Sequence, residues 1–288
     1  ATTATGGFTR GFAAVLDLVD RSRVFVKAAR LGDERHLCDW YAHEAAVAAV
    51  LPAGVPVARP RWTLTAVGYF VVCFEALSGR PPAYPWEPSA LAATLAAWAS
   101  TASALHAMAP AAARDLRLPS LGALARADLS WWQEVLYGRS PLPPDATVAR
   151  DHIRTLARLE ASFPPMADAS RSLTHGDLRV DNILIDDAGE VWFCDWNWVC
   201  FGPPWFDTVA LLVTAHASGL DADGLARAHP TLAGAPSGAV DAALASLSGY
   251  WLTRAAAGPT DASPHLREHQ RWSGSAALAW LAARQGWW

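Results

Sequence analysis

Three oxygen-bearing side chains near the middle of the chain have types and a spacing that could bind a metal ion and orient a reacting group. Asp177 and Asn182 lie in THGDLRVDNILI, and Asp195 follows in CDW. Two short apolar runs, 182–185 and 191–194, flank a glycine-containing turn, and this pattern predicts a β-hairpin. Because a hairpin folds the chain back on itself, we expect Asp195 to lie beside Asn182.

The chemistry expected of these groups depends on magnesium. Amide and carboxylate oxygens, as in Asn182 and Asp195, are hard ligands that suit Mg²⁺ already carrying phosphate oxygens and water. Asp177 remains available to orient a nucleophile. A hydroxyl group held by Asp177 and facing a metal-bound triphosphate has the geometry of in-line phosphoryl transfer.

Such a site also needs a cation on the α and β phosphates, and Lys27 in RVFVKAA is the candidate. It is the only lysine among 23 basic residues, the others being arginine. A chain that uses arginine elsewhere would keep an ammonium where the wide, planar guanidinium cannot serve. Chance is the alternative explanation.

A helix predicted from Glu34 to Leu51 places one acid on its apolar face. The residues of this face recur at spacings of three and four: Leu37, Trp40, Val47 and Leu51. Glu44 falls on the same face, and a buried carboxylate is costly without a partner. Lys27 is the expected partner, with Glu34 a weaker candidate for the same pairing. The alternative is that Glu44 is a partly exposed acid at the edge of the face.

The elements that must position these residues divide the chain into two parts. Alternating apolar residues predict two strands within 12–27 and a second strand pair within 62–77, with a bend at 66–68. Helices are expected at 91–108, 148–163 and, briefly, at Trp131 and Trp132, with 110–147 otherwise irregular and helices filling the end of the chain. We therefore predict a nucleotide-binding lobe at 1–77 and a catalytic and substrate-binding lobe at 78–288.

Composition excludes several classes of protein. Of 288 residues, 52% are hydrophobic and 17% charged, but no apolar run approaches the 18 residues of a membrane span, so no membrane association is expected. The formal net charge of -4 and the dispersed arginines argue against nucleic acid as a partner, and no protein partner is evident. Cys38, Cys73, Cys194 and Cys200 show no CxxC pairing and are expected to be reduced thiols. The chain starts without methionine and without a secretory signal pattern, so we expect a short missing piece and a cytoplasmic location.

The chain resembles the aminoglycoside phosphotransferase family, small-molecule relatives of the protein kinases. Four pieces carry the resemblance: HGDLRVDNIL, the following CDWNW, the VFVKA strand and the helix glutamate. The resemblance spans roughly residues 6–215 and implies an α+β, bilobal, protein-kinase-like fold. It implies ATP as the cofactor, with GTP not excluded, together with Mg²⁺. The expected activity is transfer of the γ-phosphate to a hydroxyl of a small molecule, either an antibiotic such as an aminoglycoside or a specialised metabolite.

The resemblance also implies roles for the central residues. Asp177 would be the catalytic base, Asn182 and Asp195 the magnesium ligands, and Lys27 with Glu44 the pair that clamps the phosphates.

Roles for the surrounding residues follow from the same resemblance. His175 would brace the catalytic loop, and Asp207 would support it from behind, cap the following helix, or do both. Arg179 would reach the transferred phosphate or be a plain surface arginine.

The nucleotide would be enclosed by two further segments. Glu75 and Leu77 would belong to a hinge whose backbone pairs with adenine. Gly7 and Thr9 would belong to a phosphate-covering loop at 6–11, which departs from G-x-G-x-x-G.

The acceptor is less defined. Only 11 residues separate Asp195 from Asp207, which leaves little platform for a peptide and favours a small alcohol. Polycations need an acidic pocket, yet residues 110–150 carry four acids against five arginines, and residues 207–288 carry six acids against five. The same segments are rich in tryptophan, which either fills gaps between helices or lines a pocket for a flat, apolar or singly cationic substrate.

Three alternatives remain open. A nucleotide-binding pseudokinase or scaffold would have no need of the base. A metal-dependent hydrolase using His175, Asp177 and Asp195 would leave Lys27 and Glu44 unexplained. A protein kinase is disfavoured by the short segment before Asp207.

Overall fold

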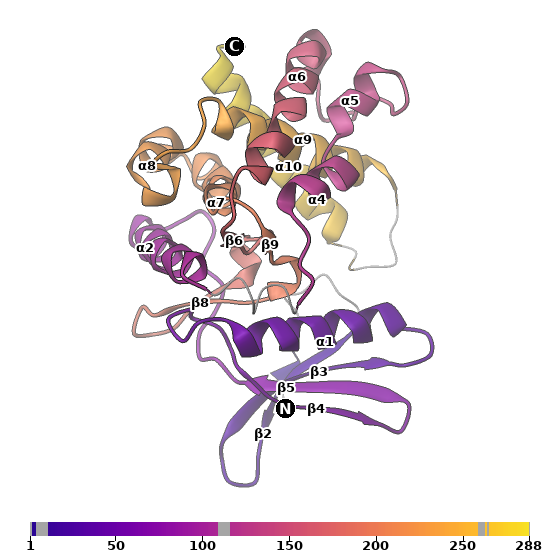
Figure 1. The fold of residues 1–288 in the computed structure, drawn as a ribbon, viewed down its shortest axis with the longest axis vertical. Helices are drawn as coiled ribbons and strands as arrows, with labels where there is room; N and C mark the ends of the chain where they lie inside the picture. The colour runs from indigo at the N-terminus through magenta and orange to yellow at the C-terminus, as the bar shows by residue number, and fades with distance from the viewer. Residues whose placement is uncertain (1, 4–10, 109–115, 259–262, 264, 288) are drawn as a thin grey trace.

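The computed structural model describes residues 2–3, 11–108, 116–258, 263 and 265–287. Gly7 and Thr9, predicted to cover the phosphates, lie outside the described residues. The chain folds into a small antiparallel sheet crossed by one helix, followed by a larger, mostly helical part (Figure 1). The predicted α+β division into a small β-rich part with one helix and a larger, mainly helical part is confirmed.

The N-terminal sheet has the strand order β1-β2-β3-β5-β4. Its strands are β1 Thr2–Thr3, β2 Phe12–Asp17, β3 Arg23–Arg30, β4 Pro60–Ala66 and β5 Tyr69–Glu75. Lys27 lies in the middle of β3, where it is paired in register with Ala13 on β2 and Val72 on β5. Since β3 is an inner strand bonded on both sides, the backbone that carries the lysine is fixed.

Helix α1 (Arg35–Val50) lies across this sheet, between the sheet and the helical lobe (Figure 1). Its buried face is formed by Leu37, Cys38, Tyr41, Glu44, Ala45, Val47 and Ala48. Trp40, which the sequence places on this face, is 46% exposed, so that part of the prediction is wrong. Tyr41 takes the buried position because a 3.6-residue period also accommodates its spacing to Leu37 and Glu44.

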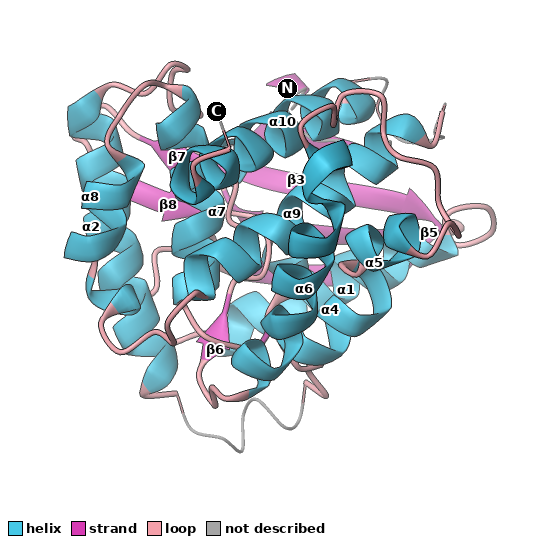
Figure 2. Cartoon of the chain, turned by 90° about the horizontal axis from the view of Figure 1, so that it is seen from above, coloured by secondary structure: helices cyan, strands magenta, loops and turns pink. Residues whose placement is uncertain are grey.

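The C-terminal lobe is built from helices around short strands, and the helices lie in layers over the strands (Figure 2). Its described α-helices are α2 Pro88–His106, α4 Leu121–Asp128, α5 Trp131–Leu136, α6 Ala149–Asp168, α7 Trp205–Ala217, α8 Ala222–Ala228, α9 Ala239–Ala256 and α10 Leu266–Gln285. Its strands and 3-10 turns are β6 Leu173–Thr174, η1 Val180–Asn182, β7 Ile183–Ile185, β8 Val191–Phe193, η2 Trp196–Trp198, β9 Cys200–Phe201 and η3 Pro230–Leu232.

Two differences from the sequence prediction lie in this lobe. Residues 110–147 were expected to be irregular apart from a short helix, but they contain α4, whose first turn is capped by the Ser120 hydroxyl accepting a hydrogen bond from the Ala123 N–H. Helix α6 was expected to end before the two prolines that follow Phe163, yet it continues to Asp168. Pro164 and Ala167 are buried in the core on that last part, so packing offsets the lost backbone hydrogen bonds.

The lobes are joined by backbone as well as by packing. Across the predicted boundary the Phe193 N–H donates to the Pro56 carbonyl at 2.8 Å, and just beyond that boundary Arg80 and Ile185 exchange N–H···O bonds of 3.1 and 2.9 Å. The hairpin β7–β8 is therefore bonded both to the segment after β5 and to the segment before β4. The exact lobe boundary at residue 77 stays a prediction.

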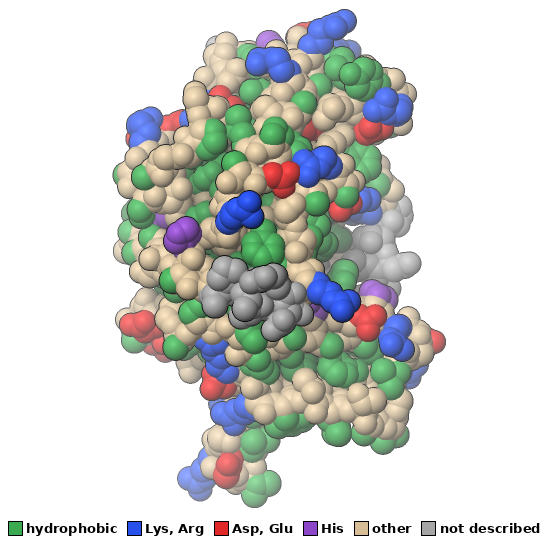
Figure 3. Space-filling view, viewed as in Figure 1, with side chains coloured by type: hydrophobic (Ala, Val, Ile, Leu, Met, Phe, Trp, Pro, Cys, Tyr) green, Lys and Arg blue, Asp and Glu red, His purple; other side chains and the backbone are tan. Residues whose placement is uncertain are grey.

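The surface and the cysteines agree with the composition. Charged side chains are scattered singly or in mixed pairs over the face seen in Figure 3, with no continuous basic stripe there. Cys38, Cys73, Cys194 and Cys200 are all free thiols, as predicted. Within the described ranges, no helix combines the length and the apolar character needed to cross a membrane.

Candidate active site

The predicted ion pair between the lone lysine and the helix acid is present. Lys27 Nζ lies 2.8 Å from Glu44 Oε1 and 2.6 Å from Oε2. Glu44 is only 6% exposed, so the alternative of a partly exposed acid at the helix edge is wrong. The rings of Phe25 and Tyr41 lie 6.0 and 5.6 Å from the ammonium and screen it from water.

Lys27 remains charged despite its burial. Burial by itself disfavours the ammonium, but the carboxylates of Glu44 and Asp195 outweigh that penalty and raise the pKa of Lys27. The effect of Asp195 is informative because this residue belongs to the other lobe. The lysine of β3 and the predicted metal ligand therefore act on each other across the lobe interface.

The catalytic loop is assembled around Asp207, which is fully buried on the first turn of α7. Its carboxylate accepts hydrogen bonds from the backbone N–H groups of His175 at 2.7 Å, Gly176 at 3.1 Å and Leu178 at 3.3 Å, and from the Thr174 hydroxyl. The prediction that Asp207 supports the loop from behind is confirmed. The helix-capping alternative is wrong, because α7 starts without a side-chain cap.

His175 braces the same loop, as predicted. Its Nδ1 accepts the Asp177 N–H at 3.3 Å, and its Nε2 lies 2.9 Å from the Cys194 carbonyl, which fixes Nε2 as the protonated nitrogen. Burial lowers the pKa of His175, so the ring is neutral. This imidazole thus ties the loop that carries Asp177 to the strand end that precedes Asp195.

Gly176 is required at its position. Its φ is +81°, a left-handed conformation that favours glycine, and an added Cβ would lie 2.2 Å from the Trp198 carbonyl oxygen. The catalytic loop and the turn after Asp195 are therefore in direct backbone contact.

Asp177 forms an ion pair that the sequence did not predict. Arg179 Nη1 lies 2.8 Å from both carboxylate oxygens of Asp177, and the same guanidinium binds Asp181 through two bonds of 3.0 and 2.9 Å. Arg179 is therefore not a plain surface arginine. Its guanidinium points toward Asp177, the predicted base. Asp181 was missed because nothing in its spacing alone marks it as the second partner of Arg179.

The environment of Asp177 is suited to a base at neutral pH. Burial raises the pKa of Asp177 to about 7, and the carboxylates of Asp195, Asp181 and Asp207 act in the same direction, while Arg179 opposes them. A general base works best when its pKa lies near the working pH.

The hairpin brings the two predicted metal ligands together as expected. The Cys194 N–H donates to the Asn182 carbonyl at 2.8 Å, which places Asp195 one residue from the backbone of Asn182. The Asn182 amide nitrogen is held by the Asp177 carbonyl at 2.8 Å, so its oxygen is oriented away from that bond. Among the described residues no cluster of three or more His, Cys, Asp or Glu side chains could hold a metal alone. One amide and one carboxylate fit Mg²⁺ that obtains its remaining ligands from phosphates and water.

Asp195 itself has an unusual backbone. Its φ and ψ are both 60°, a left-handed conformation that is uncommon for a residue with a side chain. Two residues later, the Asn197 amide nitrogen donates to Asp195 Oδ1 at 2.5 Å. Sequence reasoning missed Asn197, although its place in CDWNW was a signal.

The predicted hinge is at the end of β5. The Glu75 N–H donates to the Arg59 carbonyl at 3.0 Å, and Glu75 Oε2 accepts the Arg59 N–H at 3.2 Å, so the Glu75 side chain is engaged with the adjoining loop. Leu77 follows and is half-buried. Their contact with adenine stays a prediction.

Aromatic, basic and acidic side chains cluster where α5 meets α9. The Arg254 guanidinium lies 5.2 Å from the Trp131 ring, 5.8 Å from the Tyr250 ring and 3.9 Å from Asp128 Oδ1. Burial raises the pKa of Tyr250, with Arg254 opposing and Asp177 adding to the shift, which indicates that this phenol lies near the base.

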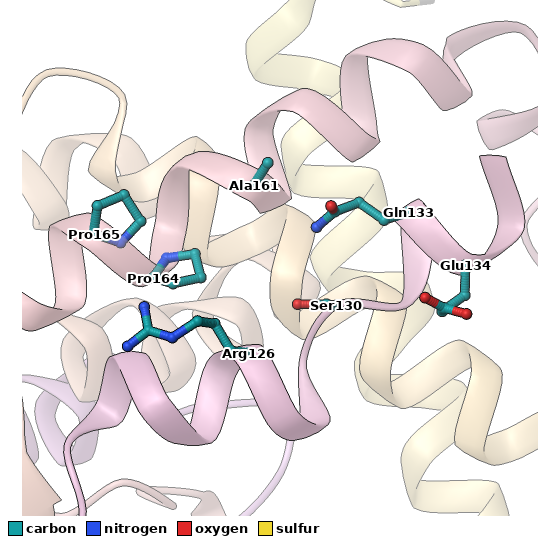
Figure 4. A pocket seen from close by; sticks show the side chains of 7 residues that line it. All are labelled: Arg126, Ser130, Gln133, Glu134, Ala161, Pro164 and Pro165. Atoms are coloured by element: carbon teal, nitrogen blue, oxygen red, sulfur yellow. The ribbon is translucent and has the colours of Figure 1, made fainter. Parts of the chain in front are cut away.

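A separate cavity of about 390 Å³ lies between α4, α5 and α6 (Figure 4). Its lining consists of Arg126, Ser130, Gln133, Glu134, Ala161, Pro164 and Pro165. None of these residues belongs to the predicted site, so this cavity is not the place where the groups described above converge.

Solved structures share this fold. Aminoglycoside 2'-phosphotransferase-IIIa in complex with GDP matches with a TM-score of 0.66 and 14% identity, over 99% of this chain and 92% of that one. A ternary complex of aminoglycoside phosphotransferase APH(4)-Ia with AMP-PNP and hygromycin B matches with a TM-score of 0.64 and 13% identity, over 99% and 94%. A putative fructosamine-3-kinase from Haemophilus somnus matches with a TM-score of 0.60 and 12% identity, over 98% and 90%.

Comparison of the sequence, in addition to the fold, identifies the family of the chain. No curated protein matches the chain. The sequence model described as the phosphotransferase enzyme family matches residues 8–240, which is most of the chain and includes Lys27, Glu44 and the catalytic loop. The family inferred from the motifs is thus confirmed, and the chain belongs to the phosphotransferase enzyme family.

Proposed function

We propose that this small-molecule kinase transfers the γ-phosphate of ATP, with Mg²⁺, to a hydroxyl group of a small acceptor. The observation that carries the proposal is the place of Asp195, which lies between the hairpin strand bonded to Asn182 and η2, the turn that packs against α1. Its carboxylate raises the pKa of both Lys27, on the N-terminal sheet, and Asp177, on the catalytic loop. A phosphate-binding cation and a base thus share one candidate metal ligand.

Each residue has a defined task in this reaction. Lys27, held by Glu44, binds the α and β phosphates. Asn182 and Asp195 would hold Mg²⁺, which would neutralise the charge on the phosphoryl group during its transfer. Asp177 orients the acceptor hydroxyl and takes its proton, and Arg179 holds that carboxylate in place. In-line displacement needs little more than this positioning and charge neutralisation.

The choice of nucleotide is part of the proposal. ATP is favoured by the motifs, and GTP stays open, since one structure with this fold is a GDP complex and another an AMP-PNP complex. The hinge at Glu75 and Leu77 would contact the base of either nucleotide.

The alternatives are less well supported. A hydrolase does not require the ion pair of 2.6 to 2.8 Å between Lys27 and Glu44. A scaffold without turnover does not require a base whose pKa is raised to about 7 by its burial. The 11 residues between Asp195 and Asp207 form η2, β9 and the start of α7, which leaves little platform for a peptide.

The acceptor is proposed to be neutral or weakly charged. Three acids on this side of the molecule have arginine partners: Asp177 and Asp181 share Arg179, and Asp128 is paired with Arg254. A polycation would gain little from carboxylates that are already neutralised. Aminoglycosides remain the first compounds to test, because two of the structural neighbours are aminoglycoside phosphotransferases.

The test is incubation of the chain with γ-labelled ATP, Mg²⁺ and a panel of aminoglycosides, other hydroxylated antibiotics and small amino alcohols. We expect label on at least one acceptor and none when Mg²⁺ is chelated. The Asp177→Asn variant should lose at least about 1,000-fold in kcat while it still binds Mg-AMP-PNP. Turnover by Asp177→Asn near the parental rate would refute the assignment of the base.

A further inference from the structure

Asn197 lies between two carboxylates of the candidate site. Its Nδ2 donates to Asp195 Oδ1 at 2.5 Å. Burial raises the pKa of Glu44, and a hydrogen-bond interaction with the Asn197 side chain acts against that rise. The residue lies on η2, the turn that packs against α1, so its amide is bonded to Asp195 and lies near Glu44 on the helix of the N-terminal lobe.

The orientation of this amide follows from its neighbours. Both Asp195 and Glu44 present acceptor oxygens, so the NH₂ group must face them and the carbonyl oxygen must face elsewhere. That oxygen, Oδ1, is shielded from solvent and accepts no hydrogen bond from any described residue. Leaving a buried acceptor unsatisfied costs free energy, and Asp195 next to it has the strained left-handed backbone.

The unsatisfied Asn197 Oδ1 and the strained backbone of Asp195 are both explained if each residue gains a partner when the nucleotide and its metal bind. Because Asn197 binds Oδ1 of Asp195, a cation would be bound through the second carboxylate oxygen, Oδ2. Mg²⁺ in nucleotide complexes keeps several water ligands, and each of those waters needs an acceptor.

We propose that Asn197 is a positioning residue that locks Asp195 for the metal, couples it to the Lys27–Glu44 pair, and offers Oδ1 to a water of the magnesium shell. The inference rests on the proposed function, because it concerns the same nucleotide site. In this role the amide of Asn197 cannot be replaced by a carboxylate or by an apolar side chain. An aspartate at this position would add a third carboxylate beside Asp195 and Glu44, and an apolar residue would remove the donor that Asn197 gives to Asp195, while Glu44 would keep Lys27.

The experiment compares nucleotide binding with and without the metal. Parent, Asn197→Leu and Asn197→Ser chains are titrated with AMP-PNP by calorimetry, once in Mg²⁺ and once in EDTA, and the half-saturating Mg²⁺ concentration is measured at fixed AMP-PNP. We expect Asn197→Leu to weaken Mg-AMP-PNP binding and raise the half-saturating Mg²⁺ about 10-fold, the size of effect that outer-shell partners of metal ligands have. Asn197→Ser, which keeps a short donor and acceptor, should lose about 3-fold, and AMP-PNP binding in EDTA should change less than about 2-fold in both.

A matched control is Ser246→Ala on α9. Ser246 also has a buried oxygen without a described partner, but it is not among the residues of the site. This variant should leave the Mg²⁺ response unchanged. If Asn197→Leu does not fold, Asn197→Ser decides the question.

The outcomes separate the two proposals. If the parent binds no Mg-AMP-PNP, the proposed function fails, and this inference fails with it. If the parent binds, but the Asn197 variants keep parental Mg²⁺ dependence or lose affinity equally with and without Mg²⁺, Asn197 is only a structural residue and this inference alone is overturned.

Discussion

Asp195 is the residue on which the two sides of the site depend. Its carboxylate interacts with Lys27 and with Asp177, and its own position is set by Asn197 and by the left-handed backbone. The charges of the site are therefore not independent: moving or neutralising the Asp195 carboxylate would alter the pKa of both Lys27 and Asp177. Substitutions here are expected to be non-additive.

Lys27→Arg is predicted to be damaging although it conserves charge. The ammonium fits between the Glu44 carboxylate and the rings of Phe25 and Tyr41, and a planar guanidinium is wider than that space and binds in a different geometry. We expect a loss of at least about 10-fold in kcat/KM for ATP, measured with any acceptor found in the panel.

Arg23→Lys is the matched control, since Arg23 lies on the same strand, is largely exposed and faces Asp17 at 3.9 Å. The reciprocal exchange there should leave kcat/KM within about 2-fold, because exposed ion pairs contribute little. A fully active Lys27→Arg enzyme would remove the explanation for the single lysine.

Among the elements, those that position the site by local folding were predictable from the sequence. The β7–β8 hairpin is local in the chain, so the meeting of Asn182 with Asp195 followed from strand pattern and turn chemistry. The ion pair of Lys27 with Glu44 followed from the cost of an acid on an apolar helix face. The exposure of Trp40 could not be predicted, because the helix period also fits a face rotated by one residue. The pairing of Arg179 with Asp181 could not be predicted either, because the partners of a charged side chain depend on how the loop folds.

Gly176→Ala should disable the catalytic loop. The substitution adds a Cβ at 2.2 Å from the Trp198 carbonyl oxygen and forces a left-handed alanine. We expect a loss of about 3 kcal/mol in the free energy of unfolding, together with loss of turnover, since the loop and the turn after Asp195 must separate. Urea unfolding followed by circular dichroism measures the first effect.

Gly219→Ala isolates the backbone contribution. Gly219 has nearly the same φ, +78°, but nothing within 4 Å of an added Cβ. This variant should lose only about 1 kcal/mol and keep its activity. Equal losses for the two variants would show that the contact with Trp198 is not important.

Glu160 makes the junction of α5 and α6 sensitive to pH. It is 1% exposed, and its two oxygens accept the N–H groups of Trp132 and Gln133 at 2.9 Å each. Burial raises the pKa of Glu160 to about 7, against the opposing effect of these backbone bonds. A carboxyl group with a raised folded-state pKa binds more protons in the folded than in the unfolded chain, so it makes stability fall as pH rises from about 4.5 to about 7.

The prediction is a difference between the parent and Glu160→Gln. The free energy of unfolding of the parent relative to the variant should decrease by about 2–3 kcal/mol between pH 5 and pH 8, as measured by urea titrations at each pH. Glutamine cannot ionise, and it also turns an NH₂ group toward one of the two backbone donors, so its own stability offset should not vary with pH. A constant difference across this range would show that Glu160 titrates normally.

At the scale of the whole molecule, a backbone bond and a ring contact connect the two lobes near the site. The Phe193 N–H donates to the Pro56 carbonyl, and the rings of Trp40 and Trp198 meet edge-on at 6.4 Å across the interface of α1 and η2. The remaining interlobe groups at the site, Lys27 on one side and Asp195 on the other, are charged and arranged for a ligand that touches both. A nucleotide with its metal would thus act as an additional connection between the lobes.

This arrangement predicts that stabilisation by nucleotide depends on the metal. A ligand that binds only the folded state at 100 times its Kd adds about 2.7 kcal/mol, which for a chain of this size raises Tm by about 5 °C or more. We expect this rise with Mg-ATP, a clearly smaller one with ATP in EDTA, and none with Mg²⁺ alone, since the metal obtains most of its ligands from phosphates and water. In Asp195→Asn the response to Mg-ATP should fall to the level seen with ATP in EDTA, because the carboxylate that joins the metal to the lobe interface is gone. A parental response in Asp195→Asn, or an equal response to ATP with and without Mg²⁺, would mean that the metal is not held between the lobes by this residue.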